Sequence, residues 1–510
     1  MIRPSFAGLA NPFVMLAFSL AVLPGPSAAA QTEPADFVEA LRPRVVTGVA
    51  DETWSLEARM AHYGVPGVAI AIIADGDIVL ATGYGVLQAG GSNPVTADTV
   101  FSAGSVSKVA TASLILHLVA QGELDLDRDV RAQLTRWQLP AERDMSPEAP
   151  VTLRALLSHT AGFNLHGFAD FQPGEALPTT VQTLDGKAPA THAPLAREHA
   201  PATRYRYSGG GYTMVQLLVS DVLERPFQEA AAAHLFAPLG LDRSSFANPL
   251  PQAHGNIARA HDRLGAPAAL PRGYEAMPEA AASGLWTSAH DLGRLVTMLM
   301  ADYHGQGRYL PQPLAIEMLT RVAPGEHGLG PRVTGLAQDF FFHHGGANNS
   351  YQTWIEGHPQ SGEGLVILTN GARGRALINE IRNAVSDTMN WTINAPVIDP
   401  GLDLPEGLLA DYAGTYTLDQ SFPLALRQQM VGRFFQNDLE IRATDGALSV
   451  GAAGTEQFFE LVPLSPTCFL IPAIEETVGL ARIDLHRDAR GRTTGMSFSL
   501  ENAISHYQRQ

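Results

Sequence analysis

The stretch Phe101-Ser-Ala-Gly-Ser-Val-Ser-Lys108 carries the strongest indication of both fold and chemistry in this chain. It places Ser105 three residues before Lys108, at the start of an apolar run that predicts a helix. Residues three apart share a helix face, so the Lys108 amine can lie beside the Ser105 hydroxyl. A serine hydroxyl becomes a nucleophile when a neighbouring base takes its proton. Because S-x-x-K also arises by chance, the motif alone leaves an ordinary structural serine as the alternative.

Tyr207 is a second candidate, inside the stretch Tyr205-Arg-Tyr-Ser-Gly-Gly-Gly-Tyr212. A tyrosine hydroxyl can shuttle protons when a nearby cation lowers its pKa, and Lys108 would be that cation. The glycines, Gly209 among them, let the backbone approach a ligand closely. Taken by itself, this stretch favours a structural tyrosine in a turn.

The third candidate is the stretch His343-His-Gly-Gly-Ala347, which follows three phenylalanines and is predicted to lie on a strand. Gly345 and Gly346 would allow a substrate backbone to lie against the strand edge. The Ala347 N–H could join the Ser105 N–H in an oxyanion hole. A zinc site at the two histidines is the competing chemistry, but no HExxH motif or spaced acidic partner supports it.

The ordered set resembles the serine β-lactamase and penicillin-binding-protein superfamily, most of all its class C branch with esterase and D-amino-acid peptidase relatives. In that family S-x-x-K is followed by Y-x-N and then by K-T-G or H-x-G. The resemblance covers roughly residues 35–390, whereas the G-x-S-x-G elbow of an α/β-hydrolase is missing. Further stretches resemble family landmarks: Gly122-Glu-Leu-Asp-Leu-Asp127, Leu156-Leu-Ser-His-Thr-Ala-Gly-Phe163, Ala282-Ser-Gly-Leu-Trp-Thr-Ser288 and Gly328-Leu-Gly330.

The resemblance implies an α+β fold of the β-lactamase/transpeptidase type, with an antiparallel sheet flanked by helices. It implies that Ser105 is the nucleophile, that Lys108 and Tyr207 share the general-base work, and that His344 replaces the Lys of K-T-G. Oxyanion donors would be the N–H groups of Ser105 and Ala347. Gly209, Gly345 and Gly346 would contact the substrate. We expect His159 to position a turn rather than to react.

Two departures from the family pattern bear on the substrate. Gly209 stands where the family usually has Asn, which contacts the substrate amide in β-lactamases, and His344 stands where β-lactamases carry a carboxylate-binding Lys. His is only partly charged near neutral pH. Both changes favour an ester or peptide substrate over a penicillin. If His344 acts as a cation, activity toward carboxylate-bearing substrates should fall as pH rises through the imidazole range.

The sequence therefore predicts a serine hydrolase that cleaves an ester or amide through an acyl-enzyme, of the carboxylesterase or D-amino-acid peptidase type. One alternative is a class C-type β-lactamase or a penicillin-binding D-Ala carboxypeptidase. Another is an acyltransferase. An alternative of another class is a non-catalytic sensor of cell-wall peptides on an inherited enzyme fold, because fold does not fix function.

Composition narrows the partners. The chain has 510 residues, a formal net charge of −17 and a single cysteine, Cys468. The negative charge argues against nucleic acid as a partner. One cysteine permits no intrachain disulfide and no cysteine-based metal site, so we expect a buried apolar role for Cys468. No cofactor and no metal are expected. The partner is a small ester, amide or peptide substrate, and the oligomeric state is open.

The organisation along the chain predicts export and two folded parts. Residues 1–30 are typical of a signal peptide: Arg3, the apolar run Phe13–Leu23, and an A-x-A site before Gln31. That run is too short to span a bilayer as a helix. The mature chain is therefore expected to be periplasmic or secreted, without stable membrane insertion. We expect the hydrolase domain at 31–395, a linker at 396–405, and a β-rich, barrel-like domain at 406–510.

Four local expectations complete the prediction. Residues 35–63 are expected to be helical. The runs 68–73 and 78–82, around Asp75-Gly76, are typical of a β-hairpin. Helical patterns return at 212–223, 226–235 and 289–300. The irregular stretch 164–204 is expected to form a flap over the site, because long irregular segments are often functional.

Overall fold

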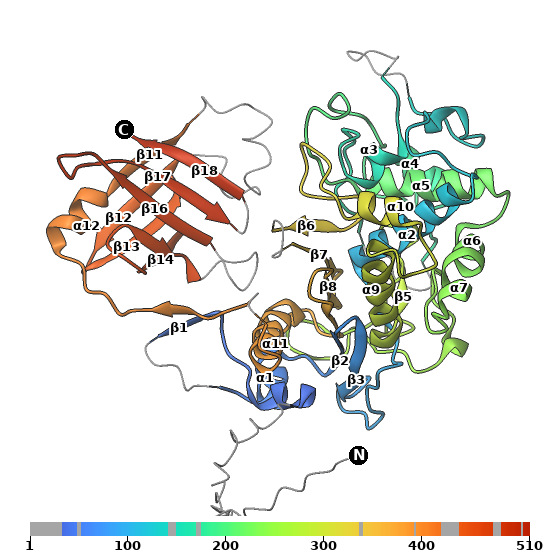
Figure 1. Cartoon of the computed structure of the whole chain (residues 1–510), viewed down its shortest axis with the longest axis horizontal. Coiled ribbons are helices and arrows are strands. Elements are labelled where there is room, and N and C mark those ends of the chain that lie inside the picture. The colour runs from blue at the N-terminus through green and yellow to red at the C-terminus, as the bar shows by residue number, and fades with distance from the viewer. Residues whose placement is uncertain are drawn as a thin grey trace, which may run out of the picture.

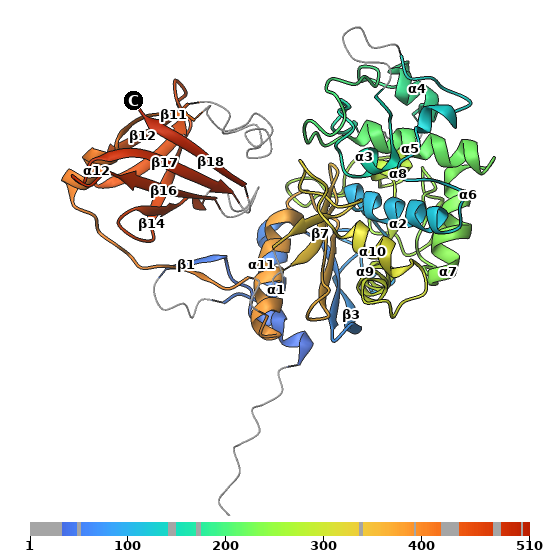
Figure 2. The ribbon, with the colours of Figure 1, turned by 45° about the horizontal axis from the view of Figure 1, so that its top comes forward.

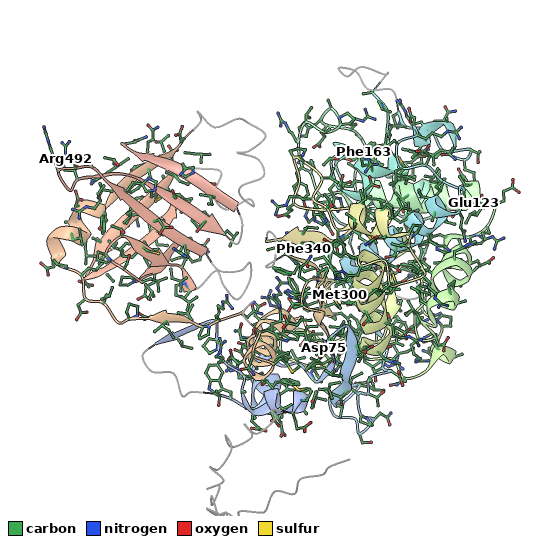
Figure 3. All side chains as sticks on the ribbon, in the orientation of Figure 1. Asp75, Glu123, Phe163, Met300, Phe340 and Arg492 are labelled. Carbon is green, nitrogen blue, oxygen red and sulfur yellow. The ribbon has the colours of Figure 1, made fainter. Side chains whose placement is uncertain are left out.

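The structure is a computed structural model that describes residues 33–47, 53–140, 149–169, 175–335, 340–391, 394–419, 438–472, 481–500 and 503–510. The predicted signal peptide, residues 1–30, lies outside this range. Figure 1 shows a body of sheet and helices with a β-barrel beside it. Figure 3 marks Glu123 and Phe163 in the helical part of the body and Arg492 in the barrel.

A six-stranded antiparallel sheet forms the centre of the body, with strand order β3-β2-β9-β8-β7-β6. The predicted hairpin is present as β2 and β3, joined through Asp75 and Gly76, both with positive φ. Positive φ at both central residues is the turn that matches the twist of paired strands. The strands are β2 (Gly67–Ala74), β3 (Asp77–Gly85), β6 (Arg332–Thr334), β7 (Phe341–Ala347), β8 (Gln352–His358) and β9 (Glu363–Thr369).

Helices cover both faces of this sheet, as alternation along β2 requires. Val68, Ile70 and Ile72 pack on one face against α1 (Leu56–Tyr63) and α11 (Gly374–Thr388). Ala69 and Ala71 face the other way, toward α9 (Ala289–Tyr303) and the main core. Every residue of β2 from Gly67 to Ile73 is buried. Because both faces of the sheet are covered, both faces of this strand are apolar, and apolar and polar residues do not alternate along it.

A helical region lies on the opposite side of the sheet from α1 and α11 (Figure 2). Its centre is α2 (Ser107–Ala120), an almost wholly buried helix that follows the single turn η2 (Gly104–Val106). A small strand pair, β4 (Phe101–Ser102) and β5 (Trp286–Thr287), fixes the chain just before that turn. The other helices are α3 (Leu153–Leu157), α4 (Thr180–Asp185), α5 (Gly209–Val222), α6 (Phe227–Ala231), the π-helical turn η4 (Ala232–Phe236), α7 (Ala237–Leu239), α8 (Ala280–Ser283) and α10 (Gln312–Met318).

The C-terminal part is a closed antiparallel barrel of eight strands. Its interior is filled by side chains such as Tyr416, Ile483 and Phe498, all fully buried, as expected for so narrow a barrel. The barrel follows α12 (Glu406–Tyr412). Its strands are β11 (Gly414–Leu418), β12 (Leu439–Thr444), β13 (Ala447–Ala452), β14 (Phe458–Pro463), β15 (Cys468–Leu470), β16 (Ala481–Arg487), β17 (Thr493–Leu500) and β18 (Ala503–Arg509).

One expectation about secondary structure is wrong. Residues 35–63 do not form one helix: the short 3-10 helix η1 (Pro34–Glu39) is followed by strand β1 (Val45–Thr47) and only then by α1. Pro43 breaks the helical pattern. The parallel partner of β1 is β10 (Val397–Asp399), which lies inside the expected linker. The helices expected at 212–223, 226–235 and 289–300 are present, the first beginning already at Gly209 and the second as α6 and η4.

Cys468 is half-buried rather than buried, and its sulfur accepts a hydrogen bond from Arg482 at 3.2 Å. This differs from the expectation of a buried apolar role, because Cys468 lies on the outward-facing side of β15 next to Asp484 of β16. Among the described residues, no helix is long and apolar enough to cross a membrane.

Candidate active site

Ser105 lies in the tight turn η2, at the entrance to α2. The preceding Gly104 has φ +50°, and a Cβ built on it would meet the Ala347 nitrogen at 2.7 Å. Only a glycine fits this backbone conformation and this close approach without strain. One helical turn later, Lys108 Nζ lies 3.4 Å from Ser105 Oγ. The contact that the spacing predicts is therefore formed.

Lys108 is buried, with 1% of its surface exposed. Its Nζ donates to the Ala282 carbonyl at 2.8 Å, at the end of α8. The amine also lies 4.8 Å from the ring centre of Tyr207 and 5.5 Å from that of Tyr212. A single amine thus faces the serine, a carbonyl and two aromatic rings, which fixes its direction toward Ser105.

His159 packs against the Tyr207 ring and bonds to the backbone on both sides of Tyr207. The His159 carbonyl accepts from Arg206 N–H at 2.8 Å, and its Nδ1 accepts from Ser208 N–H at 3.1 Å. The two rings pack at 4.2 Å. His159 itself has φ +61°, a conformation that non-glycine residues adopt rarely and mostly at functional sites. His159 lies in the turn that follows α3 and, through these two bonds, holds the backbone on both sides of Tyr207.

Strand β7 brings its glycines against the serine turn. A Cβ on Gly346 would lie 2.0 Å from the Ala103 carbonyl and 3.3 Å from the Ser105 nitrogen. The backbone of β7 therefore passes directly beside the start of η2, and Ala347 follows at the exposed end of the strand. This arrangement brings the Ser105 and Ala347 N–H groups, the two expected oxyanion donors, to the same corner of the site.

His344 is buried, and its protonation differs from that of the lysine it replaces. Burial first, and then the positive charges of Lys108 and Arg332, lower the pKa of His344 to about 3. Its Nδ1 lies 2.7 Å from the Gly345 carbonyl, so Nδ1 carries the hydrogen. Nε2 has no hydrogen-bond partner within the described part of the chain. At neutral pH, His344 is thus an uncharged side chain whose free ring nitrogen can accept a hydrogen bond.

These residues line one cavity of about 830 Å³. Ser105, Lys108, Tyr207 and the β7 residues from His343 to Ala347 are all on its wall. His166, Gly167, Phe168 and Ala169 of the expected flap also line it. Gly209 is not among the lining residues, because Phe168 covers it: a Cβ on Gly209 would be 2.8 Å from the Phe168 ring.

Several residues of the cavity wall could not be predicted from the sequence. Arg332 begins β6, and Arg375 lies on α11 with its guanidinium 4.9 Å from the Trp354 ring centre. A Cβ on Gly345 would meet this Arg375 at 2.8 Å. No motif marks these side chains, because they reach the cavity from strands and a helix far along the chain. The glycine at 345 was the only available signal of a close neighbour.

The described part of the chain contains no cluster of three or more His, Cys, Asp or Glu side chains arranged to hold a metal ion. The side chains that line the cavity include the Ser105 hydroxyl, the Lys108 amine, the Tyr207 phenol and the guanidinium groups of Arg332 and Arg375.

The fold and this constellation define a serine-hydrolase class, and comparison with known families agrees. The beta-lactamase family profile matches residues 55–386, about two thirds of the chain, so the chain belongs to the beta-lactamase family. The chain is 27% identical to penicillin-binding protein 4 of Amycolatopsis lactamdurans over 382 residues, covering 72% of this chain and 97% of that protein.

Other relatives carry different activities in their names. Esterase EstB of Burkholderia gladioli is 28% identical over 285 residues, which is 48% of this chain and 68% of the esterase. A D-aminopeptidase of Brucella anthropi is 30% identical over 199 residues, 38% of this chain and 36% of that enzyme. Members of the family are serine hydrolases, and so is this chain.

Solved structures support the fold. The octameric penicillin-binding protein homologue from Pyrococcus abyssi superimposes with a TM-score of 0.56 at 20% identity, covering 89% of this chain and 99% of that one. At such identity the likeness concerns the fold alone. It identifies the β-lactamase/transpeptidase-like architecture, and the closed barrel adds a C-terminal β-rich part as the sequence predicts.

Proposed function

We propose that this hydrolase forms an acyl-enzyme on Ser105 and cleaves an ester or an amide, in the manner of a carboxylesterase or a D-amino-acid peptidase. The observation that supports this most directly is the 3.4 Å approach of the buried Lys108 amine to the half-buried Ser105 hydroxyl on the cavity wall. In its unprotonated form, an amine at this distance can take the serine proton as the hydroxyl attacks.

The proposed reaction has two steps. Ser105 Oγ attacks the substrate carbonyl carbon, and its proton passes to Lys108 or Tyr207. The carbonyl oxygen gains negative charge, which the N–H groups of Ser105 and Ala347 stabilise. The bond to the leaving alcohol or amine breaks, and that group takes the proton. Water then attacks the acyl-enzyme and gives one proton to Lys108 or Tyr207; the bond to Ser105 Oγ breaks, the acid leaves, and Ser105 Oγ takes that proton.

Two features favour an ester or small peptide over a penicillin. Position 209 offers no side chain to a substrate amide, and Phe168 occupies the space beside it. His344 is uncharged where β-lactamases carry a lysine, because burial keeps its pKa far below neutrality. The similarity to an esterase and to a D-aminopeptidase fits both changes.

The second candidate is a β-lactamase or a penicillin-binding D-Ala carboxypeptidase. Arg332 and Arg375 both line the cavity and carry positive charge, so they could replace the missing lysine in binding a substrate carboxylate. The similarity to penicillin-binding protein 4 spans nearly all of that protein. A penicillin therefore belongs in the first experiment beside an ester.

The test is the intact mass of the protein after incubation with an aryl ester and, separately, with a penicillin. The parent should gain an acyl adduct or release product with the ester. Ser105→Ala should lose this by several orders of magnitude, as expected when a nucleophile is removed. Ester turnover alone would indicate an esterase-type enzyme, whereas a Ser105-dependent penicillin adduct would favour the second candidate.

Unchanged hydrolysis in Ser105→Ala would contradict the mechanism. A parent that binds its ligand without turning it over would instead be a sensor.

We also propose that the protein is exported, because residues 1–30 are typical of a signal peptide. The same mass measurement on protein recovered outside the cytoplasm should show a chain that begins at Gln31, whereas a full-length cytoplasmic chain would contradict export.

A further inference from the structure

The departure at Gly209 coincides with a second, independent feature, the position of the segment 164–169. This segment lies along the first turn of α5 and is fixed to it by three hydrogen bonds. Ser208 Oγ donates to the Asn164 carbonyl at 2.6 Å. The N–H groups of Gly209 and Gly210 donate to the carbonyls of His166 and Leu165, at 3.2 and 3.1 Å. The segment is therefore docked on the helix start by its backbone.

Docking of this segment places Phe168 directly on Gly209. A Cβ on Gly209 would lie 2.8 Å from Phe168 Cε2 and 3.3 Å from the His166 carbonyl. The His192 ring also contacts the Phe168 ring edge to face, with the two ring centres 5.3 Å apart. An asparagine at 209 would have to displace the phenylalanine. The glycine and the phenylalanine therefore form a matched pair.

The ring also forms part of the substrate cavity. Phe168 and Ser105 line the same cavity, and Tyr207 lies between the segment and Lys108, with its ring centre 5.0 Å from that of His166. An aromatic ring offers no hydrogen-bond donor or acceptor to a substrate. An amide that packs against it would lose its bonds to water without replacing them, whereas an alkyl or aryl group gains by leaving water.

We propose that Phe168, seated on Gly209, is the specificity-determining wall of an acyl-group subsite that accepts apolar acyl groups without an amide. The substrates would be alkyl or aryl carboxylic esters. The assignment to the acyl side follows from the resemblance, in which position 209 borders the substrate amide. This inference rests on the proposed acyl-enzyme mechanism at Ser105 and names its substrate class.

The experiment compares p-nitrophenyl esters of pentanoate and of N-acetylglycine, two acyl groups of equal chain length that differ by an amide. After correction for their rates of hydrolysis in buffer, the parent should favour pentanoate in kcat/KM by about tenfold or more, the range of selectivity that an apolar pocket provides. Phe168→Ala should reduce this preference, and Phe168→Leu should keep most of it. The double variant Gly209→Asn/Phe168→Ala should reduce it further or reverse it.

A second series holds the acyl group constant and changes the alcohol from p-nitrophenol to phenol to methanol. Phe168→Ala should leave this leaving-group preference unchanged, and thermal unfolding should show that each variant is folded. Equal use of both acyl groups by the parent would overturn the inference, as would a change confined to the alcohol series. If Ser105→Ala and the parent hydrolyse every ester alike, the proposed mechanism itself fails, which is a distinct result.

Discussion

At the scale of single residues, His344 shows how burial changes the meaning of a motif. The H-x-G pattern leaves open whether the histidine acts as a cation. In the structure its ring is buried beside Lys108 and near Arg332, and these surroundings lower its pKa to about 3. The folded protein therefore holds His344 neutral across the imidazole range. A cationic role, which would make activity fall with rising pH, does not fit this environment.

We therefore expect a flat pH dependence for the contribution of His344. The ratio of kcat/KM for a carboxylate-bearing ester to that for a matched neutral ester should stay constant between about pH 6 and 8, because His344 is already deprotonated there. In the variant His344→Gln, whose side chain does not titrate, this ratio should likewise stay constant over the same pH range. A ratio that falls about tenfold per pH unit in the parent, but not in the variant, would show that His344 acts as a cation.

The residue pattern predicts some of the site and not the rest, for a physical reason. Ser105 and Lys108 meet because helix geometry fixes neighbours three residues apart, so their contact could be predicted locally. The charge state of His344 depends on burial by distant segments, and no local pattern encodes it. The same holds for Arg375, which reaches the cavity from α11.

At the scale of elements, the site depends on the close passage of strand β7 past the turn η2. Successive residues of β7 face opposite sides of the sheet, so Gly345 and Gly346 have different neighbours. A Cβ on Gly346 would collide with the Ala103 backbone carbonyl at 2.0 Å. A Cβ on the adjacent Gly345 would come too close only to the end of the flexible Arg375 side chain, at 2.8 Å, and would make ordinary contact with the Trp354 ring at 3.5 Å. The two glycines thus tolerate a methyl group differently.

Gly346→Ala should therefore lower kcat/KM by about a hundredfold or more, because it pushes β7 away from the serine turn and misplaces one oxyanion donor. Gly345→Ala is the matched control and should lose far less, since Arg375 can move aside. Steady-state kinetics with an aryl ester would measure both, alongside melting temperatures. Equal losses in the two variants would mean that the passage is not as tight as described.

Prediction of elements succeeded where partners are close in sequence. The β2–β3 hairpin follows from its two-residue turn, and β7 follows from its apolar run and glycines. The helix expected over residues 35–63 fails because β1 pairs with β10, about 350 residues later. Such remote pairing overrides local propensity, so neither β1 nor the strand inside the expected linker could be recognised.

At the scale of the whole molecule, the buried side chains fall into separate cores. Two of them lie on the two faces of the six-stranded sheet, and the third fills the barrel. No described member of the barrel core belongs to either core of the body. On this basis we propose that the region from 406 to 510 is a domain of its own, that 31–395 forms the hydrolase domain, and that 396–405 connects them.

Separate cores lead to separate unfolding. Ile483 is fully buried in the barrel, and Ile378 is fully buried between α11 and the sheet. Truncating either to alanine should destabilise its own core by about 2–5 kcal/mol. In calorimetry of the full chain, Ile483→Ala should lower one transition and Ile378→Ala the other. Because the cavity lies wholly in the body, ester turnover at 25 °C should survive Ile483→Ala. One shared transition that both variants lower, or loss of turnover in folded Ile483→Ala, would show that barrel and body act as a single unit.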